Sequence, residues 1–144
     1  MNYLLDTNVI SESTKKNPDS SVSEFLNTVP AKSLYLSVLS IGEIRKGIAN
    51  LKDNLAKKQS LTLWLENELM NFFSGRIIPV NIAVADKWGF MTGNIKDPLP
   101  AIDSLIAATA ICNNLILVTR NSSDFSKFQL ETFNPWLSAT EVAP

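Results

Sequence analysis

The sequence predicts an α/β fold, a three-layer α/β/α sandwich with a mostly parallel central sheet. Short apolar runs alternate with longer segments of helical periodicity, an alternation typical of parallel sheets covered by helices on both faces. The chain has 144 residues, 45% of them hydrophobic, which is enough to fill one sizeable core. Since no repeat or low-complexity linker divides the sequence, we expect a single domain over residues 1–144.

Four short apolar segments are the predicted strands. They are residues 3–5, 34–37, 77–80 and 115–119. Most are rich in residues that favour β-structure, and all four are largely apolar, as strands buried on both faces are. Parallel sheets bind their ligands beyond the carboxyl ends of the strands, so functional residues are expected directly after these segments.

Five segments between the strands have apolar residues at helical spacing. They are residues 20–29, 38–51, 54–73, 82–91 and 102–112. In the third of them, the stripe predicted to face the core consists of Leu61, Leu65, Leu69 and Phe72. The last helix is nearly continuous in apolar and small residues, so we expect it to be buried, with Cys112 as a small buried hydrophobic residue.

The absence of histidine limits the chemistry that this chain can perform. It excludes Ser-His-Asp and Cys-His catalysis, the paired-imidazole ribonuclease mechanism and almost every catalytic zinc site. A hydrolase with this composition must therefore use carboxylates. Carboxylates are hard oxygen ligands, and the cations that they favour are Mg²⁺ and Mn²⁺.

The charge balance and the apolar runs indicate where the protein acts. With 13 basic and 14 acidic residues the formal net charge is -1, so any contact with nucleic acid must be local. No segment approaches the roughly 20 apolar residues needed to span a bilayer. The single cysteine cannot form an internal disulfide. We expect a cytoplasmic protein without a membrane partner.

Four carboxylates occupy positions where they could converge. Asp6 directly follows the first strand and Asp124 comes shortly after the last, while Glu43 and Asp103 lie near the starts of helices. Each alone has an ordinary structural interpretation, as a helix cap, a turn residue, a helix-dipole carboxylate or a solvated side chain. Like charges gathered in one pocket raise one another's pKa, so convergence of the four would imply a bound cation.

Four segments in this order resemble the PIN-domain family, and more closely the FitB/VapC-like toxin ribonucleases of prokaryotic toxin–antitoxin pairs. The segments are Leu5-Asp6-Thr7-Asn8-Val9-Ile10-Ser11-Glu12, Ser37-Val38-Leu39-Ser40-Ile41-Gly42-Glu43-Ile44-Arg45-Lys46-Gly47-Ile48, Asp103-Ser104-Leu105-Ile106-Ala107-Ala108-Thr109-Ala110 and Thr119-Arg120-Asn121-Ser122-Ser123-Asp124-Phe125. The closing Asn134-Pro135-Trp136 resembles the same branch. The resemblance spans nearly the whole chain.

The resemblance implies a fold, an activity and partners. It implies an α/β/α sandwich and an endoribonuclease whose Mg²⁺ or Mn²⁺ site is built from Asp6, Glu43, Asp103 and Asp124. Thr7, Asn8 and Thr119 match neighbouring polar positions that would hold site water or orient the carboxylates. It also implies a homodimer and a cognate antitoxin whose C-terminal segment covers the active groove.

Basic and aromatic residues near these motifs are weaker candidates. The basic residues nearest the motifs are Lys15, Lys16, Arg45, Lys46, Lys96 and Arg120. Among them, Arg45, Lys46 and Arg120 are our candidates for contacts with RNA phosphates, with an ordinary solvated side chain as the competing interpretation for each. We interpret Trp64, Trp88 and Trp136 as packing residues.

Two other functions compete with the nuclease. A phosphatase of the haloacid-dehalogenase type also places an aspartate after its first strand, but it needs a second aspartate two residues later, where this chain has Asn8. A non-catalytic PIN-like module that binds RNA or protein is the second alternative. The intact acidic quartet argues against it, and an assay with and without EDTA decides.

Overall fold

A five-stranded parallel sheet forms the centre of the computed structural model, which describes residues 1–96 and 99–137. The strand order is β3-β2-β1-β4-β5. The strands are β1 (Tyr3–Leu5), β2 (Leu34–Ser37), β3 (Ile77–Ile78), β4 (Ile116–Val118) and β5 (Thr132–Phe133). The predicted domain of residues 1–144 includes 97–98 and 138–144, which lie outside the described residues, so its full extent stays a prediction.

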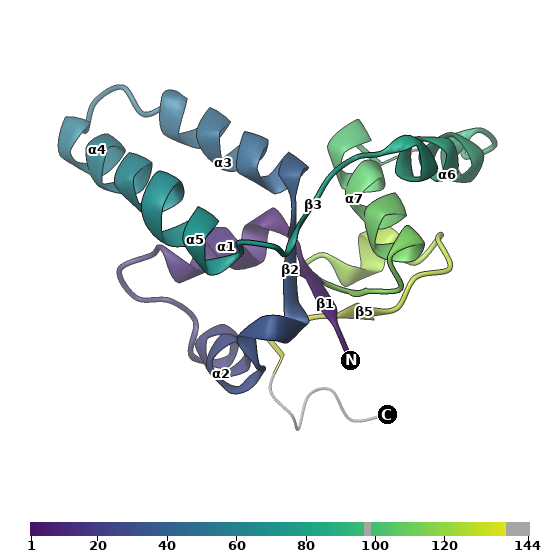
Figure 1. The fold of residues 1–144 in the computed structure, drawn as a ribbon, viewed down its shortest axis with the longest axis horizontal. Coiled ribbons are helices and arrows are strands. Elements are labelled where there is room, and N and C mark those ends of the chain that lie inside the picture. The colour runs from purple at the N-terminus through teal and green to yellow at the C-terminus, as the bar shows by residue number, and fades with distance from the viewer. Residues whose placement is uncertain (97–98, 138–144) are drawn as a thin grey trace.

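Helices cover both faces of the sheet (Figure 1). They are α1 (Thr7–Ser13), α2 (Ser20–Thr28), α3 (Val38–Ala49), α4 (Leu55–Leu63), α5 (Met70–Phe72), α6 (Ile82–Thr92) and α7 (Ala101–Cys112). Short 3₁₀ segments, Ala31–Ser33 and Ser122–Phe125, complete the connections. Asp19, Ser37 and Asn81 cap α2, α3 and α6 by accepting backbone N–H groups at the first turn, as short polar residues do at helix starts. No helix in the described parts of the chain could cross a bilayer.

Neighbouring residues of the strands point into two separate cores. Leu5 and Val118 pack among α1, α2, α3 and the long α4–α5 arm, whereas Leu4 and Leu117 pack beneath α7. Side chains of successive strand residues point to opposite faces, which is why both faces of β1 and β4 are apolar. Figure 1 shows α1 to α5 on one side of the sheet and α6 and α7 on the other. The predicted α/β/α sandwich is confirmed.

The strand order creates a switch point beside the central strand. From β1 the chain moves through β2 to β3 at one edge, then returns to the other side of β1 for β4 and β5. β1 and β4 pair with each other, yet α1 after β1 packs into one core and the 3₁₀ segment after β4 packs into the other. Such switch points leave a crevice beyond the carboxyl ends of the two strands, where open α/β sheets bind ligands.

The helix predicted at residues 54–73 contains a π-helical segment, Trp64–Leu69, between α4 and α5. The wider π turns place the buried residues at a spacing of four, at Leu65, Leu69 and Phe73. The prediction that Phe72 faces the core is therefore wrong. Phe72 is 45% exposed, and Phe73 takes its place.

Two other details differ from the sequence-based expectations. Cys112 was expected to be buried but is exposed, because it is the last residue of α7 and the core side of that helix is formed by Ile106, Ala107 and Ala110. The strand β5 was not predicted. It has only two residues, and its place in the sheet depends on pairing with β4.

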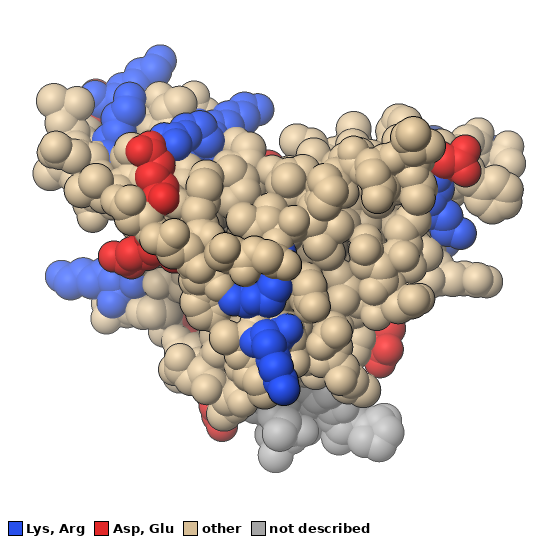
Figure 2. Space-filling view, viewed as in Figure 1, with Lys and Arg blue, Asp and Glu red and all other residues tan. Residues whose placement is uncertain are grey.

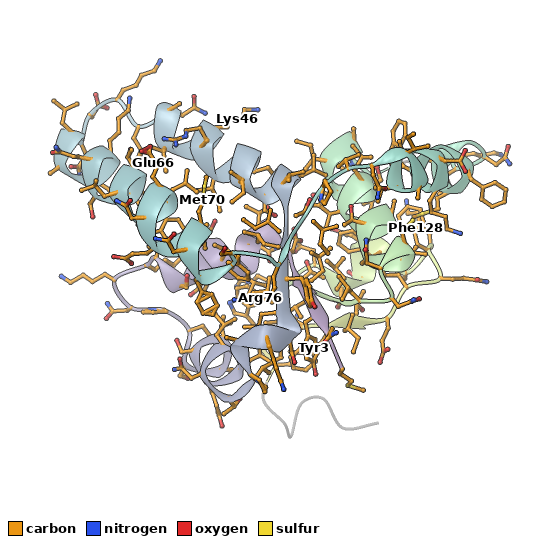
Figure 3. The ribbon with its side chains drawn as sticks, in the orientation of Figure 1. Tyr3, Lys46, Glu66, Met70, Arg76 and Phe128 are labelled. Atoms are coloured by element: carbon orange, nitrogen blue, oxygen red, sulfur yellow. The ribbon has the colours of Figure 1, made fainter. Side chains whose placement is uncertain are left out.

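Arg76 connects several elements on one side of the sheet (Figure 3). Its guanidinium donates to the carbonyls of Ala31, Leu34 and Phe72, and it lies 5.1 Å from the ring centroid of Phe72. A charged donor with three carbonyl acceptors holds the end of the helical arm against the start of β2. We therefore expect Arg76 to contribute more to the free energy of unfolding than other partly exposed residues do.

We predict that Arg76→Met lowers the free energy of unfolding by about 2 kcal/mol, because hydrogen bonds to charged groups contribute about 1.5–3 kcal/mol. Chemical denaturation monitored by circular dichroism measures the change. The control is Arg45→Met. Arg45 makes an exposed 3.0 Å ion pair with Glu66, so its loss should cost less than about 1 kcal/mol. Equal losses in both variants would contradict the assignment.

Candidate metal centre

Asp6 is the most buried of the four predicted carboxylates, with 6% of its surface exposed. It follows β1, and its backbone N–H donates to the Val118 carbonyl of β4 at 2.9 Å. Its Oδ1 accepts the N–H of Thr7 at 2.8 Å, which caps α1. Its Oδ2 accepts the Thr119 hydroxyl at 2.8 Å and lies 3.4 Å from Asn8 Nδ2. The carboxylate is thus fixed at the switch point.

Glu43 reaches the same region from the second turn of α3. The Thr7 hydroxyl donates to Glu43 Oε1 at 2.6 Å and lies 2.8 Å from the hydroxyl of Ser40. Thr7 therefore links the start of α1 to α3 and orients the glutamate. Ser40 is fully buried and Glu43 is partly buried, so Glu43 is not the fully solvated helical residue that its position alone would suggest.

Asp103 and Asp124 complete the group from the other side of the crevice. Asp103 lies in the first turn of α7, which runs against the strands and so begins at their carboxyl edge. Asp124 lies in the 3₁₀ segment after β4 and is exposed. Asp103 is partly buried. The structure thus brings carboxylates from four separate segments to one edge of the sheet.

One cavity of about 400 Å³ contains all four carboxylates in its lining. Its other lining residues are Thr7, Asn8, Ser11, Glu12, Lys15, Arg120, Asn121, Phe125 and Trp136. The cavity lies where the chain leaves β1 and β4, as expected for a switch-point crevice. Thr119 is buried behind it and acts on the site through Asp6.

Burial and mutual repulsion raise the pKa of two of these groups. Burial raises the pKa of Asp6 most, the Thr119 and Thr7 hydrogen bonds oppose the rise, and the charges of Asp103 and Glu43 add to it. Burial also raises the pKa of Asp103, and Glu43 and Asp124 raise it further. A helix N-terminus favours a nearby carboxylate charge, so at Asp103 burial and like charges outweigh the dipole. The pocket favours a positive ligand.

The donor set fits a hydrated Mg²⁺ or Mn²⁺. Within the described residues, no three acidic or cysteine side chains are gathered tightly enough to enclose an ion by themselves. Mg²⁺ usually keeps several waters and binds through only one or two carboxylates, so it does not need an enclosed site. The room in the cavity and its oxygen donors are compatible with that mode of binding.

The basic residues proposed from the sequence do not all reach the pocket. Arg45 and Lys46 are exposed on α3 outside its lining, and Arg45 pairs with Glu66. Arg120 and Lys15 line it. Lys16 and Lys96 are exposed and absent from the lining.

Glu12 belongs to the first of the four motif segments but was not predicted to line the pocket, although it lies in the pocket wall and is only 5% exposed. Its Oε1 pairs with Lys15 Nζ at 2.8 Å, and its Oε2 accepts the N–H of Asp19 at 2.9 Å. The hydrogen bond from Lys15, and then that from Asp19, lower the pKa of Glu12. Glu12 therefore connects α1 to the loop before α2. It also forms an ion pair with Lys15, one of the basic residues of the pocket wall.

Comparison with known proteins gives one consistent result. The PIN domain model matches residues 3–129. The chain is 36% identical to the toxin FitB of Neisseria gonorrhoeae over 92% of this chain and 97% of that protein. It is 31% identical to the VapC ribonuclease Y4jK of Sinorhizobium fredii over 92% and 96%. The solved structure of FitAB bound to the IR36 DNA fragment superposes with a TM-score of 0.87 at 33% identity, covering 94% of this chain and 96% of that one.

We predict that Asp103→Asn melts at least as high as the parent in EDTA near neutral pH. The raised pKa means that the folded state takes up a proton more readily than the unfolded state. The contribution of Asp103 to stability is therefore lost as pH rises from the pKa of the unfolded state, near 3.8, through the raised pKa of the folded state. The variant has no carboxyl group at this position, so its melting temperature should fall less over that pH range. Thermal melts between pH 3.5 and 8, about every half unit, measure this.

Added Mn²⁺ should raise the melting temperature of the parent by several degrees, because a ligand bound only by the folded state stabilises it. The Asp103→Asn variant should respond much less. A variant that melts well below the parent in EDTA, yet keeps the full Mn²⁺ response, would identify Asp103 as a structural helix-start residue.

Proposed function

The chain belongs to the PIN-domain family, and from this premise we propose that it is a metal-dependent endoribonuclease, the toxin of a toxin–antitoxin pair. The observation that supports this most directly is the single cavity lined by Asp6, Glu43, Asp103 and Asp124 at the switch point of the sheet. The names of the relatives agree, since one is a toxin and another a ribonuclease.

The four carboxylates are the residues that we assign to the cation, either Mg²⁺ or Mn²⁺. A divalent cation bound there supplies Lewis-acid chemistry, activating water and neutralising charge on the phosphodiester. Thr119 and Asn8 keep Asp6 in place, and Thr7 does the same for Glu43. Partners that orient metal ligands in this way typically change metal affinity or activity about 10- to 100-fold when removed.

Contacts with the RNA backbone are the part of the proposal that depends on surface charge. Arg120 lines the pocket, and Arg45 and Lys46 lie on the exposed side of α3. Figure 2 shows basic side chains gathered at the α3–α4 end of the molecule. Local clusters of this kind can bind phosphates although the net charge is -1.

This chain has an apolar surface to which the proposed antitoxin partner can bind. A second cavity of about 320 Å³ lies between α1, α2 and the helical arm, with Leu26, Trp64 and Phe72 among its lining residues. A smaller cavity of about 160 Å³ shares Trp64 with it and shares Thr7 and Glu43 with the carboxylate pocket. A protein segment bound in the apolar cavity could therefore extend to the carboxylates.

We predict Mn²⁺- or Mg²⁺-dependent cleavage of RNA by the purified protein, and its loss in EDTA. Asp6→Asn and Asp103→Asn should each reduce kcat by about a hundredfold or more, because each removes charge that holds the cation. Gel assays on total RNA and on a labelled oligoribonucleotide measure this. Expression without the antitoxin should arrest growth of the host, and both variants should relieve the arrest.

The matched control is Asp86→Asn, which removes an exposed aspartate on α6 outside the pocket. It should cleave as the parent does. RNA binding without cleavage in any metal would favour the non-catalytic module. Undiminished toxicity of both pocket variants would overturn the site.

We also predict a homodimer in solution. Several large apolar side chains are exposed on the helices, among them Leu55 (76%), Leu63 (57%), Ile82 (88%) and Phe90 (81%). Leu55 and Leu63 both lie on α4, and we assign this helix to the contact between two copies of the chain. Light scattering at micromolar concentration should give twice the monomer mass, and Leu63→Glu on the helical arm should shift it toward the monomer. A monomeric parent would contradict the proposal.

A further inference from the structure

Arg120 lies at the rim of the carboxylate pocket with its guanidinium against an aromatic ring. The guanidinium carbon is 5.0 Å from the ring centroid of Trp136, and both residues line the cavity. Trp136 is partly buried and packs against the core beneath α1 to α5. Because the ring is anchored, it can hold the guanidinium in one orientation.

Backbone contacts fix both residues relative to the carboxylates. The side-chain amide of Asn134 donates to the Arg120 carbonyl at 3.1 Å, and its oxygen accepts the Trp136 N–H at 2.9 Å. The Arg120 N–H donates to Asn8 Oδ1 at 3.4 Å, and Asn8 Nδ2 lies 3.4 Å from Asp6 Oδ2. A continuous series of contacts thus connects Trp136 to the buried carboxylate.

The two basic residues of the pocket wall differ in how much charge they can offer a ligand. Lys15 is paired with Glu12 at 2.8 Å. Lys15 and the Asp19 N–H lower the pKa of Glu12 most, and the charge of Arg120 adds to this effect. Among the described residues, however, Arg120 forms no ion pair within 4 Å and its guanidinium donates to no protein acceptor. Its five N–H donors are therefore available at the edge of an acidic cavity.

We infer that Arg120 binds a phosphate of the RNA strand beside the carboxylates, and that Trp136 is its positioning residue. This inference rests on the proposed nuclease function and extends it. Of the three basic residues considered for RNA contacts, it assigns only Arg120 to a phosphate beside the carboxylates. Arg45 and Lys46 lie outside the pocket, whereas Arg120 is at its mouth. A guanidinium can donate two parallel hydrogen bonds to one phosphate, which fixes direction as well as distance.

The role of Trp136 is orientation of Arg120 before RNA arrives. An arginine that is already stacked loses less conformational freedom when it binds a phosphate. Trp136 is thus more than the packing residue that the sequence indicated. Its effect on RNA should depend on Arg120, and this dependence distinguishes positioning from support of the fold.

The test is steady-state cleavage of a random-sequence, fluorophore–quencher oligoribonucleotide in Mn²⁺. Arg120→Gln should lower kcat/KM about ten- to hundredfold, since a charged hydrogen bond to phosphate is lost. Most of the change should lie in KM. Arg120→Lys should recover part of the loss. The slope of log kcat/KM against log salt should become shallower by about 0.7 in Arg120→Gln, the value for one phosphate contact on a single strand.

Trp136→Leu should lower kcat/KM about two- to fivefold in the parent. It should have little further effect in the Arg120→Gln background, because the two residues act through one contact. The control is Lys87→Gln, which removes a similar cation–aromatic contact on α6, outside the pocket. This variant should cleave as the parent does.

The outcomes separate the inference from the proposed function. A parent that does not cleave RNA in Mn²⁺ or Mg²⁺ overturns the nuclease and this inference with it. A parent that cleaves, together with Arg120→Gln of unchanged KM and salt slope, overturns the inference alone. Additive losses from Trp136→Leu and Arg120→Gln overturn the positioning role.

Discussion

Asp6 is buried at the carboxyl end of the central strand, where an ionised carboxylate is stable only if hydrogen bonds or positive charge compensate for lost water. Its oxygens accept from Thr7 at the start of α1 and from Thr119 after β4. The Thr119 hydroxyl is available only because β1 and β4 are neighbours in the sheet. The acidic pocket therefore depends on the strand order. A change that separates β1 from β4 would also separate Asp6 from Thr119.

The sequence predicted those features that depend on local pattern. Buried strands and helices show their periodicity directly, and Asp6 and Asp124 were found because they follow strands. Features that depend on tertiary contacts were not predicted. Phe73 replaces Phe72 in the core because of a π-helical segment, and β5 exists only through its pairing with β4. Glu12 was not predicted to line the pocket, since its position there depends on the hydrogen bond from the Asp19 backbone on the next loop.

Under the proposed function, the pocket has to accept both a cation and a polyanion, and different residues serve the two ligands. Carboxylates from four segments make the interior acidic, and burial makes Asp6 and Asp103 harder to ionise in the absence of a cation. Lys15 is already paired with Glu12, so it adds little to the field at the mouth. This leaves Arg120 as the basic residue of the described pocket wall whose guanidinium donors are not engaged by those residues and can meet a phosphate.

The hydrogen bond between Asp6 and Thr119 joins residues that are 113 positions apart in the sequence. Asp6 leaves the ribosome early in synthesis, but the strand that supplies its partner is made much later, as are Asp103 and Asp124. A growing chain that has not reached β4 cannot bury Asp6 in its final setting, and long-range parallel pairing is slow to form. The carboxylate pocket is therefore complete only after β4 and the 3₁₀ segment that follows it have been made. Under the nuclease function proposed above, a chain that still lacks these segments has no complete metal site with which to cleave RNA.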